Sequence, residues 1–518
     1  MNHAFCNTCQ KLVPADTVER EGRMYLAKHC PECGETETLI SGNARRYMAK
    51  RALDAGGDQQ ACRLNCLNCK HAQPPTLIFI DITNRCNLNC PICINNTPSM
   101  GFLFEPPLEY FETIFAHYAT YQPRPAIQLF GGEPTVRDDL FDIIKMAKAH
   151  HLAPRVVTNG LKLADEDYCR RLIQTRATIL IAYDGANPRT YEELRGSAKV
   201  LDLKQKALAN IRTIGGAKVT FMTCLARGFN DDEIPEIFAL CHEHVGTVRA
   251  IYFMPLAHSW DPKDWDFHPE RMTTEDVEEM VDDAFPDDAL DFLPAGLLGQ
   301  LPALKRCLRV KPLPFLGAHP NCESVYLLLS DGEDYVPLAR YLKGTTTEMA
   351  QAFLDAEKRL ASRVEALDTG WWGRLLARLH LKDAALFLKG IRTVYSVFRR
   401  HGRLDVILKG RGLGKVLHGL AIPIGLLFGR KSRRLMERHT TVHGVLQIII
   451  LPFEDKENIE TDRLVRCPAS FAFVDPEGGA VKSVPVCAWG LHKTPMMRKI
   501  ADHYTAEAPK PEAVEAEG

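Results

Sequence analysis

Clustered cysteines are the residues of this chain whose spacing points most directly to chemistry. Ten of the 17 cysteines lie within the first 93 of 518 residues. They form two Cys-x2-Cys pairs and two Cys-x3-Cys-x2-Cys triplets: Cys6, Cys9, Cys30 and Cys33, then Cys62, Cys66 and Cys69, then Cys86, Cys90 and Cys93. The N-terminal residues lack the basic start and apolar stretch of a signal peptide, so we expect a cytoplasmic protein. Clustered cysteines in such a chain typically bind metal rather than form disulfides.

The two N-terminal pairs predict a mononuclear metal site. Four thiolates at this spacing form a tetrahedral site from two knuckles, as in zinc ribbons and rubredoxin-like iron sites, and the metal replaces the core that this segment lacks. Sulfur ligands alone leave zinc and iron open. Residues 1–40 are therefore predicted to be a four-cysteine metal-binding module.

The triplet Cys86, Cys90 and Cys93 follows directly after a predicted strand at residues 76–84. Three thiolates hold three irons of a 4Fe-4S cluster, and the fourth iron then has no protein ligand and is open to a small molecule. This spacing therefore indicates a catalytic cluster rather than one that only transfers electrons.

A second motif, Gly131-Gly132-Glu133-Pro134, follows the next predicted strand. Glycines allow close backbone approach, and a carboxylate complements an ammonium group. Asn159 and Asp184 end later strands and are further candidates for cofactor contacts. The alternative is that the first motif is an ordinary strand-to-helix turn and that Asn159 and Asp184 are turn formers before glycine.

Alternating patterns predict the elements that hold these residues. Six strands are expected at 76–84, 125–130, 154–158, 177–183, 217–224 and 247–254. Helices are expected between them at 107–121, 137–151, 164–174, 202–214 and 231–243. This order predicts an α/β fold with a parallel sheet, open or closing into a partial barrel, and a ligand at the carboxyl ends of its strands.

Over residues 76–258, these motifs resemble the radical S-adenosylmethionine (SAM) superfamily. The resemblance implies a partial (β/α)6 barrel and a SAM-binding 4Fe-4S cluster at Cys86, Cys90 and Cys93. It also implies that the Gly-Gly-Glu-Pro segment contacts the methionine amino group. SAM would be cleaved to a 5′-deoxyadenosyl radical that removes hydrogen from the substrate, after reduction by a donor such as ferredoxin or flavodoxin.

The earlier triplet, at Cys62, Cys66 and Cys69, follows no strand and is predicted to hold an auxiliary iron-sulfur cluster. Its fourth ligand must come from elsewhere. Later cysteines are candidates for this and a further cluster, with structural burial as the alternative: Cys307, Cys322, Cys467 and Cys487. We therefore predict two or three 4Fe-4S clusters and one mononuclear iron or zinc.

Within the superfamily, the whole cysteine arrangement resembles the tetraether lipid synthase group, which joins lipid tails carbon to carbon. The layout is also similar to a related archaeal enzyme that methylates a pterin precursor. The prediction is an enzyme that couples two unactivated carbons of lipid tails. A radical SAM methyltransferase acting on a pterin or another small substrate is the alternative, and a non-catalytic iron-sulfur electron-transfer protein is the alternative of another class.

Charge is distributed unevenly along the chain. The formal net charge is −1, but residues 371–440 hold 16 Lys or Arg against three Asp or Glu, interleaved with Leu, Phe and Trp. This composition suits helices lying on an anionic membrane and predicts a peripheral protein that meets its lipid substrate there. The alternative is basic helices packed on the protein's own acidic surface. Nucleic acid is not expected as a partner, because aromatic residues are not interleaved as stacking platforms.

The remaining predicted regions follow from these motifs. They are a linker with the auxiliary triplet at 41–75, the barrel at 76–258, an auxiliary or substrate region at 259–370, the basic segment at 371–440, a mixed C-terminal cluster-binding region at 441–504 and a disordered tail at 505–518.

Overall fold

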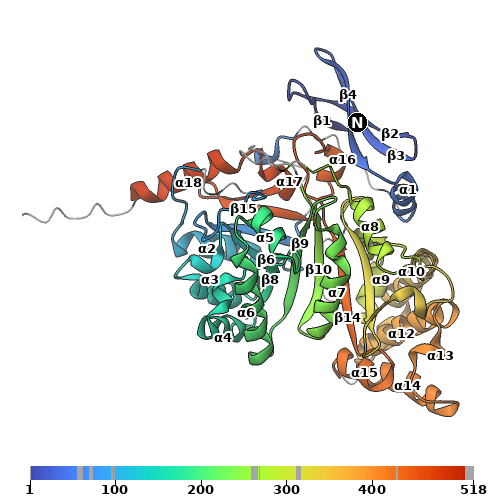
Figure 1. Cartoon of the computed structure of the whole chain (residues 1–518). Coiled ribbons are helices and arrows are strands. Elements are labelled where there is room, and N and C mark those ends of the chain that lie inside the picture. The colour runs from blue at the N-terminus through green and yellow to red at the C-terminus, as the bar shows by residue number, and fades with distance from the viewer. Residues whose placement is uncertain are drawn as a thin grey trace, which may run out of the picture.

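A computed structural model describes residues 2–54, 56, 62, 64–68, 74–94, 97, 100–257, 267, 269–310, 317–427 and 430–507. Its centre is a sheet whose middle strands are all parallel and are flanked by helices (Figure 1). These strands are β5 (Leu77–Thr83), β6 (Ala126–Gly131), β7 (Ala153–Thr158), β8 (Thr178–Ala182), β9 (Val219–Leu225) and β10 (Val248–Pro255). The six predicted strands are therefore confirmed.

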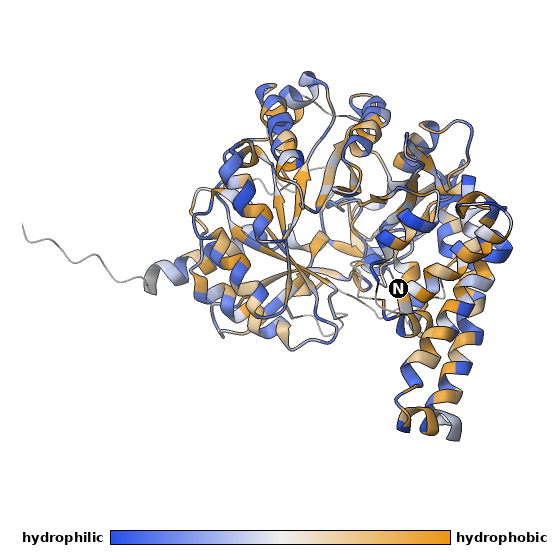
Figure 2. Ribbon diagram, turned by 90° about the horizontal axis from the view of Figure 1, so that it is seen from below, coloured by the Kyte–Doolittle hydropathy of each residue, from blue (hydrophilic) through white to orange (hydrophobic). Residues whose placement is uncertain are grey.

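Helices alternate with these strands as the sequence predicts. They are α2 (Leu108–Ala119), α3 (Leu140–Ala149), α4 (Glu166–Gln174), α5 (Pro188–Arg195), α6 (Lys199–Ile214) and α7 (Ile234–Glu243). Helix α5 was not predicted. The strands are mostly hydrophobic, whereas the surrounding helices mix apolar and polar residues (Figure 2). Strands β5 and β9 are buried along their whole length, as expected for a sheet covered on both faces.

The C-terminal region extends the sheet at both edges. Strand β14 (Gly444–Ile450) pairs parallel with β10, and β15 (Ala469–Val474) pairs parallel with β5. The order is β11-β12-β14-β10-β9-β8-β7-β6-β5-β15-β16, with β13 beside β12. The added strands are β11 (Leu293–Pro294), β12 (Ser324–Ser330), β13 (Tyr335–Pro337) and β16 (Val481–Pro485).

The N-terminal module is a four-stranded antiparallel sheet with a small core of its own. It consists of β1 (His3–Phe5), β2 (Leu12–Arg20), β3 (Arg23–Cys30) and β4 (Gly34–Ser41), followed by α1 (Ala44–Ala52). Strand β4 ends at Ser41, one residue beyond the predicted module. Lys50 of α1 is buried against Glu275 and Glu278 of α8 (Thr274–Asp283), so this ion cluster joins the module to the central domain.

The remaining helices lie in the C-terminal half. They are α9 (Pro302–Leu308), α10 (Thr346–Thr369), α11 (Trp371–Arg378), α12 (Lys382–His401), α13 (Leu404–Ile407), α14 (Leu413–Leu427), α15 (Ser432–His439), α16 (Thr461–Leu464), α17 (Val486–Trp489) and α18 (Lys493–Glu507). Residues 505–507 belong to α18, so the tail predicted from residue 505 begins too early, and residues 508–518 lie outside the described part. No described helix combines the length and apolarity needed to cross a bilayer.

Candidate functional site

A cavity of about 190 Å³ opens at the carboxyl ends of the central strands. Its rim includes all three cysteines of the second triplet, together with Gly132 and Glu133. Two motifs that lie about forty residues apart in the sequence are therefore brought to one site. This is the position where open parallel sheets generally bind ligands, because loops from neighbouring strands converge there.

The two glycines hold the cysteine loop. A Cβ at Gly131 would lie 2.2 Å from the Thr83 carbonyl oxygen, and one at Gly132 would lie 2.2 Å from that of Arg85. Instead, the Gly132 N–H donates to the Thr83 carbonyl at 2.7 Å, and the Glu133 N–H donates to the Arg85 carbonyl at 2.8 Å. The segment just before Cys86 is thus fixed by the Gly-Gly-Glu turn.

The Glu133 carboxylate is buried and already has several hydrogen-bond donors. Its Oε1 accepts from the Thr135 N–H at 3.0 Å, the Thr135 hydroxyl at 2.5 Å and the Thr158 hydroxyl at 2.7 Å. Its Oε2 accepts from the Asn159 N–H at 2.6 Å. Glu133 therefore joins the ends of β6 and β7, and Oε2 is the oxygen with the larger remaining capacity for an ammonium ligand.

Asn159 lies at the rim and contacts the cysteine loop. Its Nδ2 donates to Asn87 Oδ1 at 2.7 Å, while its own Oδ1 accepts from the Leu161 N–H at 3.0 Å. Pro134 is buried in the short helical turn after Glu133. The predicted residues Gly131, Glu133 and Asn159 thus line one cavity.

Asp184 lies behind the cavity wall and holds Arg195, which does line it. The Arg195 guanidinium donates to both Asp184 oxygens, at 2.7 and 2.8 Å. Burial opposes ionisation of Asp184, but Arg195 outweighs this effect and lowers the pKa of the carboxyl. Arg195 also hydrogen-bonds the Cys90 side chain. The sequence identified Asp184 but missed Arg195, which follows on α5.

A second cation lies close to this pair. Lys204 is buried, and its ammonium donates to the carbonyl oxygens of Asn159, at 2.7 Å, and Ala182. Burial lowers the pKa of Lys204 to about 8, with Arg195 adding to the shift. Two cations, Arg195 and Lys204, and two carboxylates, Asp184 and Glu133, therefore lie close together next to the cysteine loop.

Gln128 and Tyr252 form a polar floor of the cavity, and Arg155 lies beside them without lining it. Gln128 and Arg155 are register partners on β6 and β7, with exposed fractions of 2% and 8%. Arg155 donates to the Tyr252 hydroxyl at 2.9 Å, and Gln128 and Tyr252 line the cavity. Within the described chain, Gln128 Oε1 and Arg155 Nε have no hydrogen-bond partner. Sequence patterns missed this floor because Gln128 and Arg155 lie within strand runs.

The walls above this floor are apolar. They include Phe79, Phe130, Met222, Met254 and Phe453. A low-dielectric enclosure of this kind keeps water from reactive species. A smaller cavity of about 40 Å³ shares Phe130 and Phe453 and extends to Cys487.

The late cysteines do not all converge. The thiols of Cys322, Cys467 and Cys487 lie near enough to affect one another electrostatically, although burial is the main cause of their raised pKa values. Cys307 instead lies in a separate helical core with Leu304 and Leu360.

The earlier triplet is described only in part. Cys66 lies in a short helical turn (Cys66–Asn68) that packs against β16, the strand leading to Cys487. Cys62 and Cys66 are both buried. Cys69 lies outside the described residues.

The N-terminal sulfurs form a compact group. The Sγ atoms of Cys6, Cys9, Cys30 and Cys33 all lie within 4.8 Å of one another, and those of Cys9 and Cys30 are 3.7 Å apart. A tetrahedral zinc site with Zn–S bonds of about 2.3 Å has sulfur separations of about 3.8 Å. The four thiols therefore fit one zinc ion.

Comparisons with known proteins agree with both sites. The HMPTM N-terminal zinc ribbon domain matches residues 2–42. A 7,8-dihydro-6-hydroxymethylpterin dimethyltransferase from Methanocaldococcus jannaschii is 28% identical, over 96% of this chain and 95% of the relative. The mycofactocin maturase MftC of Mycolicibacterium smegmatis is 26% identical, over 40% of this chain and 51% of the relative.

Among solved structures, SuiB of Streptococcus suis bound to S-adenosylmethionine is similar with a TM-score of 0.33 and 14% identity, over 55% of this chain and 70% of that chain. The Radical SAM superfamily matches residues 80–241. That range runs from β5 to α7 and contains the cysteine loop, the Gly-Gly-Glu turn and most of the cavity wall. Residues 80–241 of this chain are therefore similar to the radical SAM superfamily.

Proposed function

We propose that this radical SAM enzyme is a methyltransferase acting on a small polar heterocycle of the pterin class. The observation that carries the proposal is the polar floor, where Gln128 Oε1 lines the cavity and is buried without a hydrogen-bond partner in the described chain. An amide oxygen in the floor suits the edge of a heterocycle that offers a hydrogen-bond donor. Similarity to a pterin dimethyltransferase over 96% of the chain supports the same class.

The rim residues fit the cofactors of the superfamily. Cys86, Cys90 and Cys93 lie at one cavity and would supply three thiolates to a 4Fe-4S cluster, whose fourth iron would then be available to SAM. When bound, SAM and the reduced cluster supply a 5′-deoxyadenosyl radical that removes hydrogen from carbon. We expect a small redox protein such as ferredoxin or flavodoxin to provide the electron.

The chain's own groups orient the reactants. Asp184 holds the Arg195 guanidinium beside Cys90, where its positive charge favours a carboxylate or a thiolate. Glu133 fixes the ends of two strands and directs Oε2 toward an ammonium group. The apolar walls exclude water, while Gln128 and Tyr252 hold the polar edge of the substrate and Arg155 positions the Tyr252 hydroxyl.

Auxiliary clusters belong to the same proposal. Cys62, Cys66 and Cys69 would hold one cluster, and Cys322, Cys467 and Cys487 would supply ligands close to the apolar wall. Their support is the convergence of the three late thiols and the small cavity that leads from Phe130 to Cys487. Cys307 is the weakest of these candidates, because it lies in a different core.

Carbon–carbon coupling of lipid tails is the second candidate. It is favoured by the apolar side chains above the floor, including Phe79, Phe130 and Met254, which suit an alkyl chain. In this reaction, each of two tail carbons loses one hydrogen and the two carbons become joined. In methylation, a substrate hydrogen is replaced by a methyl group that we expect SAM to supply.

Isotope transfer separates the two candidates. The anaerobically reconstituted full chain would be reduced and supplied with trideuteromethyl SAM and either hydroxymethyl dihydropterin or a membrane lipid extract. We expect a pterin product that carries the labelled methyl group, detected by mass spectrometry. A lipid product that has lost two hydrogens and gained no label would overturn the methyltransferase assignment in favour of coupling.

The floor provides an independent check. Gln128→Leu removes the unpaired acceptor, so we expect KM for the dihydropterin to rise about tenfold to a hundredfold, the equivalent of about 1.5–3 kcal/mol. SAM cleavage without substrate should be unchanged, because no hydrogen bond among the described residues joins Gln128 to the cysteine loop. An unchanged KM would remove Gln128 from substrate recognition.

A further inference from the structure

The helices α10 to α15 carry an unusual concentration of exposed apolar side chains. Of the 20 large hydrophobic side chains that the described residues expose, 13 lie between positions 371 and 424. Isolated exposed hydrophobic residues are ordinary, whereas a grouped set marks an interaction surface. We call residues 346–440 the helical extension. Figure 1 places it beside the central sheet, away from the N-terminal module.

Helix α14 has one continuous apolar stripe that faces solvent. Its members are Leu413, Val416, Leu417, Leu420 and Ile424, with exposed fractions from 53% to 83%. Spacings of three and four residues place them on the same side of the helix. A soluble helix normally turns such a stripe toward the core, whereas the stripe of α14 is exposed.

Two further helices repeat this arrangement. On α11, Trp371 and Trp372 stack with centroids 4.0 Å apart and are 60% and 56% exposed. On α12, Leu388 and Tyr395 are exposed one heptad apart, and Arg392 lies on the same side between them. Tryptophan, tyrosine and arginine beside aliphatic residues are typical of the boundary between headgroups and acyl chains.

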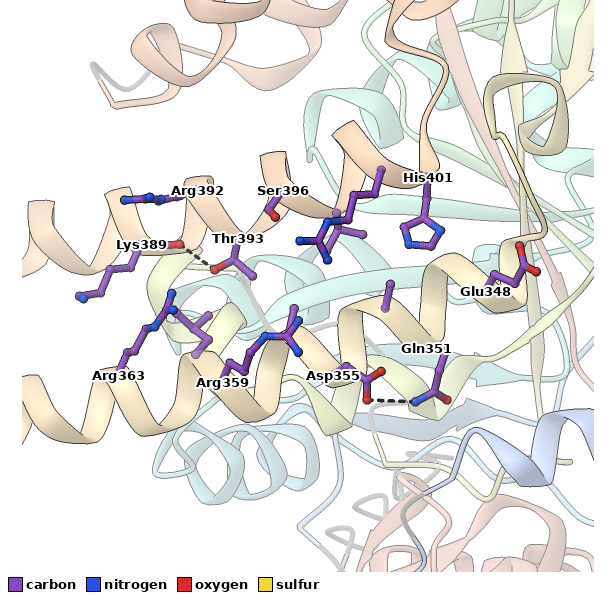
Figure 3. A pocket seen from close by; sticks show the side chains of 15 residues that line it. Glu348, Gln351, Asp355, Arg359, Arg363, Lys389, Arg392, Thr393, Ser396 and His401 are labelled. Atoms are coloured by element: carbon purple, nitrogen blue, oxygen red, sulfur yellow. Dashed lines mark hydrogen bonds between the residues drawn. The ribbon is translucent and has the colours of Figure 1, made fainter.

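A basic groove lies between α10 and α12. It has a volume of about 1240 Å³, and cations on both helices line it, namely Arg359, Arg363, Lys389, Arg392 and Arg400. Figure 3 shows Arg359 and Arg363 rising from α10 toward α12. Across the described residues, these five side chains form no ion pair within 4.0 Å, although Glu348 and Asp355 also line the groove. Like charges held together without partners favour an anionic ligand.

We propose that the helical extension docks on an anionic phospholipid bilayer. The apolar stripe of α14 and the stacked tryptophans enter the interface, and the groove cations face headgroup phosphates. Charge complementarity supports this occupant, because residues 371–440 hold 16 basic against three acidic residues in a chain whose net charge is −1. The other occupants fit only one of the two features. If nucleic acid bound here, the aliphatic stripe would stay in water, and if an apolar protein surface bound here, the groove cations would stay unpaired.

Vesicle sedimentation of the cluster-loaded full chain tests the proposal without any catalytic readout. We expect partition onto phosphatidylcholine vesicles that contain phosphatidylglycerol, much weaker partition onto phosphatidylcholine alone, and loss of binding at high salt. Absence of partition onto the anionic vesicles at low salt would overturn the proposal. Because no substrate is present, failure here is independent of failure of the methyltransferase assignment.

Stripe variants test the apolar part. Leu417→Ser with Leu420→Ser should weaken partition by about tenfold or more, because the residues are exposed and make no core contact that serine would remove. The matched control is Leu203→Ser with Leu298→Ser, two exposed leucines outside the helical extension, which should leave partition unchanged. If the stripe variant loses helical circular dichroism, Trp371→Ser is the replacement. Equal losses in stripe and control variants would contradict the proposal.

Groove variants test the electrostatic part. Arg359→Gln with Arg363→Gln should weaken partition and flatten its salt dependence, whereas Lys145→Gln with Lys206→Gln, exposed lysines of the central domain, should do neither. Two other outcomes would overturn the bilayer as occupant. One is a dimer that Leu417→Ser dissociates, and the other is tight binding to an oligonucleotide that the groove variant alone abolishes.

Discussion

At the scale of single residues, the cavity rim is held together by hydrogen bonds between loops. Glu133 accepts from both Thr135 and Thr158, and Asn159 contacts Asn87 of the cysteine loop. The carboxylate is therefore both a candidate ligand for an ammonium group and a structural junction. A substitution there changes binding and stability together, so each must be measured.

Glu133→Gln tests the double role. The carboxylate now accepts hydrogen bonds from N–H and O–H groups, and an amide nitrogen, itself a donor, cannot accept them. We therefore expect the free energy of unfolding to fall by about 1–3 kcal/mol. SAM affinity should fall by about 1.5–3 kcal/mol, the range for a charge-assisted hydrogen bond. Denaturant titration and calorimetry measure the two effects. Unaltered SAM affinity would leave Glu133 with the structural role alone.

Gly132→Ala tests how the turn supports the cysteine loop. The added methyl would lie 2.2 Å from the Arg85 carbonyl oxygen, so the loop must move, at a cost of about 1–3 kcal/mol. We expect less cluster after reconstitution, measured by iron content and absorbance, although all three cysteines remain. Gly478→Ala is the control, because a Cβ there meets nothing within 4 Å. Normal cluster loading in Gly132→Ala would contradict this role.

At the scale of elements, the parts that local sequence patterns could predict are those with regular periodicity. The six central strands and the cysteine-bearing loop follow from apolar runs and from motif spacing. Strands β14 and β15 could not be placed, because pairing with β10 and β5 joins residues about two hundred to four hundred positions apart. The cavity floor was missed for a similar reason, since the contact of Arg155 with Tyr252 spans the sheet.

The residues that line the candidate site were predictable where a motif marks them. Gly132, Glu133 and Asn159 line the cavity as expected, whereas Arg195 and Lys204 sit on helices with no motif. Asp184 was found by its place at a strand end, yet its contact with Arg195 required the fold. For Cys307, the residue type suggested that it binds a cluster, whereas the fold places it among apolar side chains of a separate core.

Lys50→Met tests the ion cluster between α1 and α8. It leaves Glu275 buried without its cation and Glu278 with only Arg46, 3.9 Å away, so we expect a loss of about 3 kcal/mol of stability at neutral pH. Burial raises the pKa of Glu278 even though Lys50 opposes the shift, and removing Lys50 must raise it further. The folded state then binds more protons than the unfolded state, so stability falls as pH rises through this pKa.

Thermal or denaturant unfolding at several pH values measures this effect. The variant should recover stability as pH is lowered toward the ordinary glutamate range. Lys206→Met on the exposed side of α6 is the control and should change stability little. A pH-independent loss in Lys50→Met would mean that packing, not charge, dominates at this junction.

At the scale of the whole molecule, clustered cysteines are distributed over three parts of the fold. The zinc ribbon is a separate four-stranded sheet, the radical SAM triplet follows β5, and the late thiols lie around β15 and α17. Buried ion pairs and the paired strands connect these parts. We therefore expect each metal site to be removable without loss of the others.

Replacing Cys86, Cys90 and Cys93 with alanine tests this independence at the catalytic triplet. Reductive cleavage of SAM should be abolished, because the only other thiol among the described residues that line the cavity is Cys224, and one thiol cannot replace three. Zinc bound by the four N-terminal cysteines should remain at one ion per chain, measured by elemental analysis. Simultaneous loss of zinc and all iron would show that the sites fold as one unit.

Replacing Cys322, Cys467 and Cys487 with alanine tests the auxiliary site. If these thiols hold a cluster, iron should fall by about four atoms per chain, while zinc and SAM cleavage persist, because the radical SAM triplet and the ribbon are built from other residues. The control is Cys169→Ala with Cys241→Ala, two fully buried thiols inside helices, which should leave iron unchanged. Unchanged iron content in the triple variant would show that the late cysteines only pack in the core. The small cavity next to Cys487 would then not adjoin an auxiliary cluster.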